Sequence, residues 1–186
     1  MFDRSLNALL QRPLQSLAKI LLAKGISPNQ MTWVGFGVGL CTVPLIAFEY
    51  YLWAVVCIAL NRLADGLDGT MARLTQATDL GAFLDIALDF LFYASIPLAF
   101  VLANPAQNGL AGVLLIYSFI GTGCTFLAYA VLAAKRGDTS TAYPQKGIYY
   151  LGGLTESSET ISVFVLMCVF RLGLQCWPVF LPPCAH

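Results

Sequence analysis

The stretch that decides the fold is DGLDGTMARLTQATDLGAFLDIALD, which runs from Asp65 to Asp89. It holds five of the chain's ten acidic residues, although 58% of the 186 residues are hydrophobic and only 11% are charged. On a helix that turns about 100° per residue, Asp65 and Asp68 share one face. Asp85 and Asp89 are four residues apart and share one face of the following helix. We expect the two helices to pack antiparallel, so that all four carboxylates converge.

Such a cluster of carboxylates needs a positive partner. Two carboxylates about 4 Å apart repel by roughly 4 kcal/mol at an effective dielectric constant of 20. An aspartate at the centre of a membrane helix costs about 2.5–3.5 kcal/mol more. Either the acids are protonated or cations neutralise them. Several oxygen ligands with access to water suit Mg²⁺ or Mn²⁺, which commonly hold substrate phosphates. The pattern therefore predicts a metal-dependent phosphoryl-type site with two divalent cations.

The residues around the acids suit a bulky phosphorylated ligand. Gly69 and Ala72 carry little or no side chain, so a ligand can approach the backbone on their face. Arg73 flanks that face with a planar guanidinium whose geometry matches phosphate. The alternative is a solvated loop with helix caps, but such a loop does not require small residues at these offsets.

The composition indicates an all-α membrane protein. Its charged fraction lies well below the roughly 25% of soluble domains. The net charge is zero and no polybasic cluster occurs, so we expect no nucleic-acid partner. A spanning helix needs roughly 20 apolar residues. Five segments are candidates for transmembrane helices: residues 31–48, 50–64, 81–103, 109–134 and 149–170.

The cationic residues predict the orientation. Nine of the ten Lys and Arg side chains lie on alternate segments that share one side, and only Arg171 lies opposite. Cationic segments stay in the cytoplasm. We therefore expect a multi-pass protein of a bacterial inner membrane, with the N-terminus and the acidic stretch facing the cytoplasm.

The chain divides into three expected parts. In residues 1–26, leucines recur at helical spacing opposite basic residues, which predicts an amphipathic helix on the membrane surface. Pro13 should break it into two short pieces, and Gly25 should end it. Ser27 and Pro28 are typical of a helix start, as cap and first-turn proline.

Residues 27–170 form the expected transmembrane domain. Residues 171–186 form a short tail whose adjacent prolines exclude another full span. Three glycines stand at every second position within the first span. A glycine-rich nucleotide loop would follow a β-strand, and no strand precedes these glycines, so they predict close helix packing instead. They are Gly35, Gly37 and Gly39.

At its acidic stretch the sequence resembles the CDP-alcohol phosphatidyltransferase family (class I). The family pattern is D-x2-D-G-x2-A-R, a spacer, and then G-x3-D-x3-D. The matching residues are Asp65, Asp68, Gly69, Ala72, Arg73, Gly81, Asp85 and Asp89. The spacer of seven residues is shorter than is usual in the family. Asn29 and Thr32, after Pro28, match further, and the likeness covers about residues 25–165.

The resemblance implies an activity and its residues. Family members transfer a substituted phosphate from a CDP-linked lipid alcohol to a second alcohol and release CMP. Asp65, Asp68 and Asp85 would bind the metals, and Asp89 would lie at the metals and act as general base. The nucleotide and its diphosphate would be bound by part of the same set: Asp68, Gly69, Ala72, Arg73, Gly81, Asn29 and Thr32. The family implies six spans and a homodimer, whereas this sequence predicts five spans.

The acceptor alcohol has weaker candidates. Glu156 and Glu159 lie in the last predicted span, where acidic side chains are functional by default, although a structural pair is an equal alternative. Lys135, Arg136 and Lys146 suit a phosphate on the acceptor, but charges that set topology explain them better. None of these residues identifies the alcohol.

Two other functions use acidic residues in membrane helices. A Mg²⁺-dependent prenyltransferase binds prenyl diphosphate through aspartate-rich motifs, and Asn61, Asp65 and Asp68 loosely fit one. Such enzymes need a second aspartate-rich segment far along the chain, which this sequence lacks. A membrane metal-ion carrier needs polar groups through the bilayer, whereas here the acids gather at one face.

Overall fold

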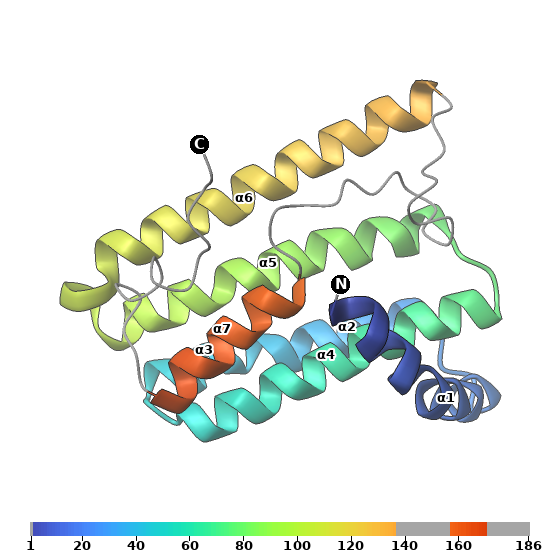
Figure 1. Cartoon of the computed structure of the whole chain (residues 1–186), viewed down its shortest axis with the longest axis horizontal. Coiled ribbons are helices and arrows are strands. Elements are labelled where there is room, and N and C mark those ends of the chain that lie inside the picture. The colour runs from blue at the N-terminus through green and yellow to red at the C-terminus, as the bar shows by residue number, and fades with distance from the viewer. Residues whose placement is uncertain (1, 137–156, 171–186) are drawn as a thin grey trace.

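The computed structural model describes residues 2–136 and 157–170, and this part of the chain is all α-helical (Figure 1). The helices are α1 (Phe2–Ala23), α2 (Pro28–Leu40), α3 (Thr42–Ala47), α4 (Tyr51–Leu74), α5 (Asp79–Ala103), α6 (Pro105–Arg136) and α7 (Ser157–Phe170).

Three segments of the described chain are long and apolar enough to cross a membrane: Pro28–Ala47, Asp79–Ala103 and Pro105–Leu132. The first combines α2 and α3, because the predicted single helix is interrupted at Cys41. α4 continues past its predicted apolar part to Leu74 and carries charged residues there. The described part of α7 is shorter, and its predicted start lies outside the described residues. The all-α membrane fold is thus confirmed, and the number of spans stays a prediction.

The first helix corrects one expectation. α1 is continuous and holds Pro13 inside it, so the prediction of two separate pieces is wrong. A proline removes one backbone hydrogen bond, which bends a helix without always ending it, and the ribbon of α1 changes direction along its length (Figure 1). The apolar face of α1 packs on α4, where Ala18 is buried with Leu67 and Met71.

The turn between α1 and α2 follows from local residues. Gly25 has a φ of 81°, a left-handed conformation that glycine adopts without steric cost. The amide of Gly25 donates to the carbonyl of Leu22 (2.9 Å), and that of Ile26 donates to Leu21 (3.1 Å). This pair of backbone hydrogen bonds is a Schellman motif. Ser27 then caps α2 in a reciprocal capping box with Gln30, as predicted for a helix start.

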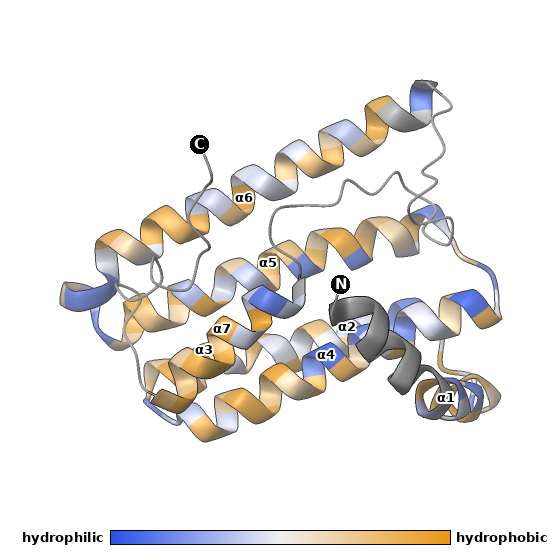
Figure 2. Cartoon of the chain, viewed as in Figure 1, coloured by the Kyte–Doolittle hydropathy of each residue, from blue (hydrophilic) through white to orange (hydrophobic). Residues whose placement is uncertain are grey.

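The helices form one bundle around a shared apolar core. α2 and α3 each pack against both α4 and α5, α6 packs along α5, and α7 packs on α4 (Figure 1). Ile46, Ile58, Phe92, Ile96 and Phe164 are fully buried where these helices meet. Apolar residues make up most of the bundle, whereas hydrophilic residues lie in the last turns of α4 and α6 and also in the middle of α4 (Figure 2). The core therefore holds α4 and α5 beside each other through α2 and α3.

Two of the three glycines of α2 allow this packing. A Cβ atom at Gly35 would lie 2.7 Å from the Cβ of Ala64, and one at Gly39 would lie 2.8 Å from Phe92. A Cβ at Gly37 would meet nothing within 4 Å in the part of the chain that the structure describes. The predicted close packing is thus confirmed for Gly35 and Gly39 and is wrong for Gly37.

This difference gives a matched pair of variants. Gly35→Ala should lower the free energy of unfolding by about 1–3 kcal/mol, because the new methyl group meets a Cβ that cannot rotate away. Gly37→Ala should be neutral or stabilise by up to about 1 kcal/mol, because alanine favours the helix. Thermal unfolding in the same detergent measures both. Equal midpoints for the two variants would contradict the packing of α2 on α4.

Candidate active site

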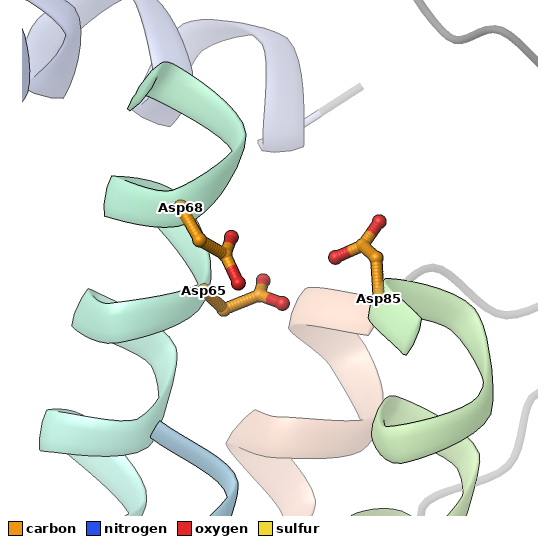
Figure 3. Close-up of side chains that lie close together, drawn as sticks. All are labelled: Asp65, Asp68 and Asp85. Carbon is orange, nitrogen blue, oxygen red and sulfur yellow. The ribbon is translucent and has the colours of Figure 1, made fainter. Parts of the chain in front are cut away.

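Three of the predicted acids meet between two helices. Asp65 and Asp68 lie on the second half of α4 and point toward Asp85 on the first half of α5 (Figure 3). One carboxylate oxygen from each lies within 4.8 Å of the others. The sequence predicted this convergence from direct packing of the two helices. In the structure, the acids converge because α2 packs against both α4 and α5 and lies beside the acids.

The ends of the two helices bring the acids to the same level. α4 remains helical through Leu74, so the spacing of its acids is that of a regular helix. α5 begins at Asp79, and the hydroxyl of Thr78 accepts a hydrogen bond from the amide of Gly81 (3.0 Å). Asp85 therefore lies nearly two turns into α5, opposite the acids of α4.

A small cavity opens at the acids. All four aspartates line it, together with residues of α2 and α4 and one leucine of α5. Its lining residues are Thr32, Gly35, Phe36, Asn61, Arg62, Asp65, Asp68, Asp85, Leu88 and Asp89. The site predicted from the spacing of the acids is therefore a single concave surface.

Asp68 has the environment of a metal ligand. Its side chain is 5% exposed, and neither carboxylate oxygen has a hydrogen-bond partner among the described residues. Burial, to which the carboxylates of Asp85 and Asp89 add, raises the pKa of Asp68 to about 7. A buried carboxylate without donors is costly unless a cation neutralises it. The oxygen-only donor set of Asp65, Asp68 and Asp85 thus fits a divalent cation such as Mg²⁺ or Mn²⁺.

Asp89 lies in the same cavity with a different set of partners. Arg62 donates from Nη2 to its Oδ1 atom, and the hydroxyl of Tyr93 donates to its Oδ2 atom (2.8 Å). Sequence reasoning counted Arg62 only as a charge that sets topology, and it did not consider Tyr93. Sequence spacing was an available signal for contacts with the acids. Arg62 lies three residues before Asp65 on α4, and Tyr93 lies four residues after Asp89 on α5.

Two of the seven residues predicted for the nucleotide, Thr32 and Asp68, line the cavity, and the other five do not. A Cβ at Gly81 would lie 3.0 Å from Oδ1 of Asn29, so only glycine fits there without a shift. Thr32 lines the cavity, and its hydroxyl donates to the carbonyl of Pro28 (3.1 Å). Gly69 is open apart from Arg73, whose nearest guanidinium nitrogen would lie 3.5 Å from an added Cβ.

Farther along α4, Arg73 is exposed and donates to the hydroxyl of Thr70 (3.0 Å). Ala72 beside it is half-buried. These two residues lie one to two turns beyond the acids of α4 and are not part of the cavity lining. Their contacts with a nucleotide stay predictions.

The structure describes the side chains of two acceptor candidates, Lys135 and Glu159. Lys135 is exposed near the end of α6, and Glu159 is exposed in the first turn of α7. Neither lines the cavity. Arg136 ends α6, and Glu156 and Lys146 lie outside the described residues. The acceptor site therefore stays a prediction.

Comparison with known proteins decides the family. A family model described as CDP-alcohol phosphatidyltransferase matches residues 26–179. The chain belongs to the CDP-alcohol phosphatidyltransferase family. This match covers most of the chain and includes every residue of the cavity. Membership of the family supports a transferase that acts in phospholipid metabolism, and it decides against the prenyltransferase and the ion carrier.

Three relatives illustrate the family. The chain is 49% identical over 186 residues to the "Inner membrane protein YnjF" of Escherichia coli, covering 95% of this chain and 90% of the relative. It is 34% identical to the "Archaetidylinositol phosphate synthase" of Pyrococcus horikoshii, over 87% of this chain and 79% of that protein. It is 29% identical to the "Phosphatidylinositol phosphate synthase" of Corynebacterium glutamicum, over 80% of this chain and 65% of that protein. Together with the apolar helices, these likenesses indicate a bacterial membrane protein.

Proposed function

We propose that this protein transfers a phosphatidyl group from a CDP-linked lipid alcohol, such as CDP-diacylglycerol, to a second alcohol and releases CMP. The observation that carries the proposal is the convergence of three carboxylates from two helices. Both oxygens of one of these carboxylates, that of Asp68, are buried and have no hydrogen-bond partner among the described residues. Such a site suits a diphosphate held through divalent cations. The motif that the family shares runs through the same residues.

Divalent cations complete this site in the proposal. Asp65, Asp68 and Asp85 would hold two Mg²⁺ or Mn²⁺ ions, with Asp89 beside them. When bound, the cations neutralise the diphosphate and stabilise the charge that develops on its oxygens. Arg73 would bind a diphosphate oxygen at the outer edge, where its side chain is exposed. Asn29, Thr32, Gly69, Ala72 and Gly81 would surround the nucleotide.

The proposed reaction is a displacement at the lipid-linked phosphorus. The acceptor hydroxyl oxygen forms a new bond to that phosphorus, while the bond from phosphorus to the oxygen shared with CMP breaks. CMP leaves with the electron pair, and the hydroxyl proton passes to Asp89. Its place on the cavity wall beside the three-acid group supports this role.

The proposed orientation places the cavity at the cytoplasmic membrane surface. The C-terminal ends of α4 and α6 and the N-terminal end of α5 lie at one end of the bundle, beside α1 (Figure 1). Lys24, Arg73 and Lys135 are exposed at this end. Cationic segments favour the cytoplasm. A water-soluble acceptor would then reach the site from the cytosol while the lipid donor stays in the inner leaflet. The homodimer that the family implies is part of the same proposal.

The acceptor is proposed by chemical class only. Two relatives carry names of inositol phosphate lipid synthases, so a phosphorylated polyol is the first class to test. Lys135, Arg136 and Lys146 would suit its phosphate, and Glu156 and Glu159 its hydroxyls. Glycerol phosphate, serine and other phospholipids are the competing acceptors.

The release of CMP tests the proposed function. Purified protein in nanodiscs, with CDP-diacylglycerol and Mn²⁺ or Mg²⁺, should release CMP only when a suitable alcohol is added, and mass spectrometry should find the matching lipid. Inositol phosphate, glycerol phosphate, serine and phosphatidylglycerol form the panel. EDTA should abolish the release. Release that persists in EDTA would contradict the metal-dependent site.

A further inference from the structure

We propose that Arg62 and Tyr93 position Asp89 and keep it out of the metal-binding group, so that Arg62 is the built-in counter-ion of this fourth carboxylate. This inference rests on the proposed function for the role of Asp89. It assigns to Arg62 and Tyr93 a function that the family motif does not include. It also divides the four acids into a group of three that binds cations and one that is held by the protein itself.

The contacts of Asp89 carry the first step. Its Oδ1 atom accepts from Nη2 of Arg62, and its Oδ2 atom accepts from the hydroxyl of Tyr93 (2.8 Å). Arg62 also donates from Nη1 to the hydroxyl of Tyr93 (3.2 Å). Both oxygens of Asp89 are therefore fixed by partners that hydrogen-bond to each other. Asp68, whose oxygens have no such partners, is the opposite case.

The second step is that Arg62 is itself held rigidly. Its Nε and Nη2 atoms donate to Oδ1 of Asn61 (2.9 and 2.7 Å). Asn61 is buried and donates in turn to the carbonyl of Gly35 on α2 (2.9 Å). The guanidinium carbon lies 5.1 Å from the ring centroid of Phe92 and 5.4 Å from that of Tyr93, within the range of a cation–π contact. This network links α2, α4 and α5 and fixes the guanidinium.

The third step concerns charge. Nη1 of Arg62 lies 3.6 Å from Oδ2 of Asp65, an acid of the three-residue group. The guanidinium therefore neutralises Asp89 at the cost of repelling a cation that binds beside it. Without Arg62, Asp65 and Asp89 would both be free to bind the cation. Loss of this arginine should thus tighten cation binding and weaken catalysis, whereas loss of a purely structural residue would weaken both.

The test compares Mn²⁺ binding with phosphatidyl transfer in the full chain in nanodiscs. Arg62→Met should bind Mn²⁺ about tenfold more tightly, by electron paramagnetic resonance, while kcat falls by about a hundredfold. Arg62→Lys keeps the positive charge but loses the planar guanidinium and its several donors. This variant should bind Mn²⁺ like the wild type and lose about tenfold in kcat. Tyr93→Phe should leave Mn²⁺ affinity and KM unchanged and lower kcat by about tenfold.

Two control variants match these changes elsewhere in the protein. Lys24→Met removes a positive charge after α1, and Tyr117→Phe removes a hydroxyl from the exposed face of α6. Both should behave like the wild type in binding and transfer. Unchanged or weaker Mn²⁺ binding in a folded Arg62→Met protein would overturn the inference. If that variant does not fold, wild-type kcat in Tyr93→Phe would overturn it instead.

The outcomes separate this inference from the proposed function. If the wild-type protein binds Mn²⁺ but transfers to no alcohol, the proposed function fails. The effect of Arg62→Met on Mn²⁺ binding still decides whether Arg62 keeps Asp89 out of the metal-binding group.

Discussion

Replacing Asp68 by asparagine is expected to abolish Mn²⁺-dependent binding of CDP-diacylglycerol and to lower CMP release by about a thousandfold. The reason is that both oxygens of Asp68 are buried, lack partners among the described residues and lie in the three-acid group. Loss of charge stabilisation at a reacting centre typically costs a factor of about 10²–10³, and a lost cation adds to it. Mn²⁺ titration and the CMP assay measure the two effects.

The same variant should fold at least as well as the wild type. Asparagine carries no charge to bury, so the unfavourable burial of the carboxylate disappears. The thermal unfolding midpoint without metal should therefore be equal or higher. Asp79→Asn is the matched control, because Asp79 is exposed in the first turn of α5 and lies outside the cavity. Wild-type Mn²⁺ affinity in Asp68→Asn would remove Asp68 from the metal site.

Asp89→Asn should separate binding from chemistry. An asparagine keeps the shape of the side chain but cannot accept the proton of the acceptor hydroxyl. General base catalysis contributes a factor of about 10²–10⁴, so kcat should fall by that amount. The Mn²⁺ and donor affinities should fall far less than in Asp68→Asn, because Arg62 and Tyr93 hold Asp89 apart from the cation ligands. Single-turnover transfer and Mn²⁺ titration measure the two quantities separately.

Two results would contradict this account of Asp89. Full turnover in Asp89→Asn would exclude it as the base. A loss of Mn²⁺ binding as large as that in Asp68→Asn would make Asp89 a metal ligand, and Arg62 would then not keep it out of the metal-binding group.

The fold could be predicted where short sequences determine it. Apolar runs of sufficient length indicated the long apolar helices, and Ser27 and Gly25 marked helix ends by their own hydrogen bonds and conformation. The features that were missed depend on tertiary packing. Pro13 stays inside α1, and the first span is interrupted at Cys41. The place of α2 beside both acid-bearing helices could not be read from their sequences.

The candidate site was predictable to the extent that helical periodicity defines it. Asp65 and Asp68 on one face, and Asp85 on the next helix, follow from spacing and do converge. One contact of Asp89 was not predictable, because its partner Arg62 lies on another helix. Sequence spacing brings Tyr93 near Asp89, but only the structure shows that the Tyr93 hydroxyl donates a hydrogen bond to the Asp89 carboxylate. Two of the residues proposed for the acceptor, Lys146 and Glu156, lie outside the described chain.

The most direct test compares one acid from each helix in a single Mn²⁺ titration. In nanodiscs containing CDP-diacylglycerol, Asp65→Asn on α4 and Asp85→Asn on α5 should each lose the high-affinity Mn²⁺ signal seen by electron paramagnetic resonance. Equal losses would mean that both helices contribute ligands to one cation site. Wild-type binding in either variant would contradict a metal centre shared between α4 and α5.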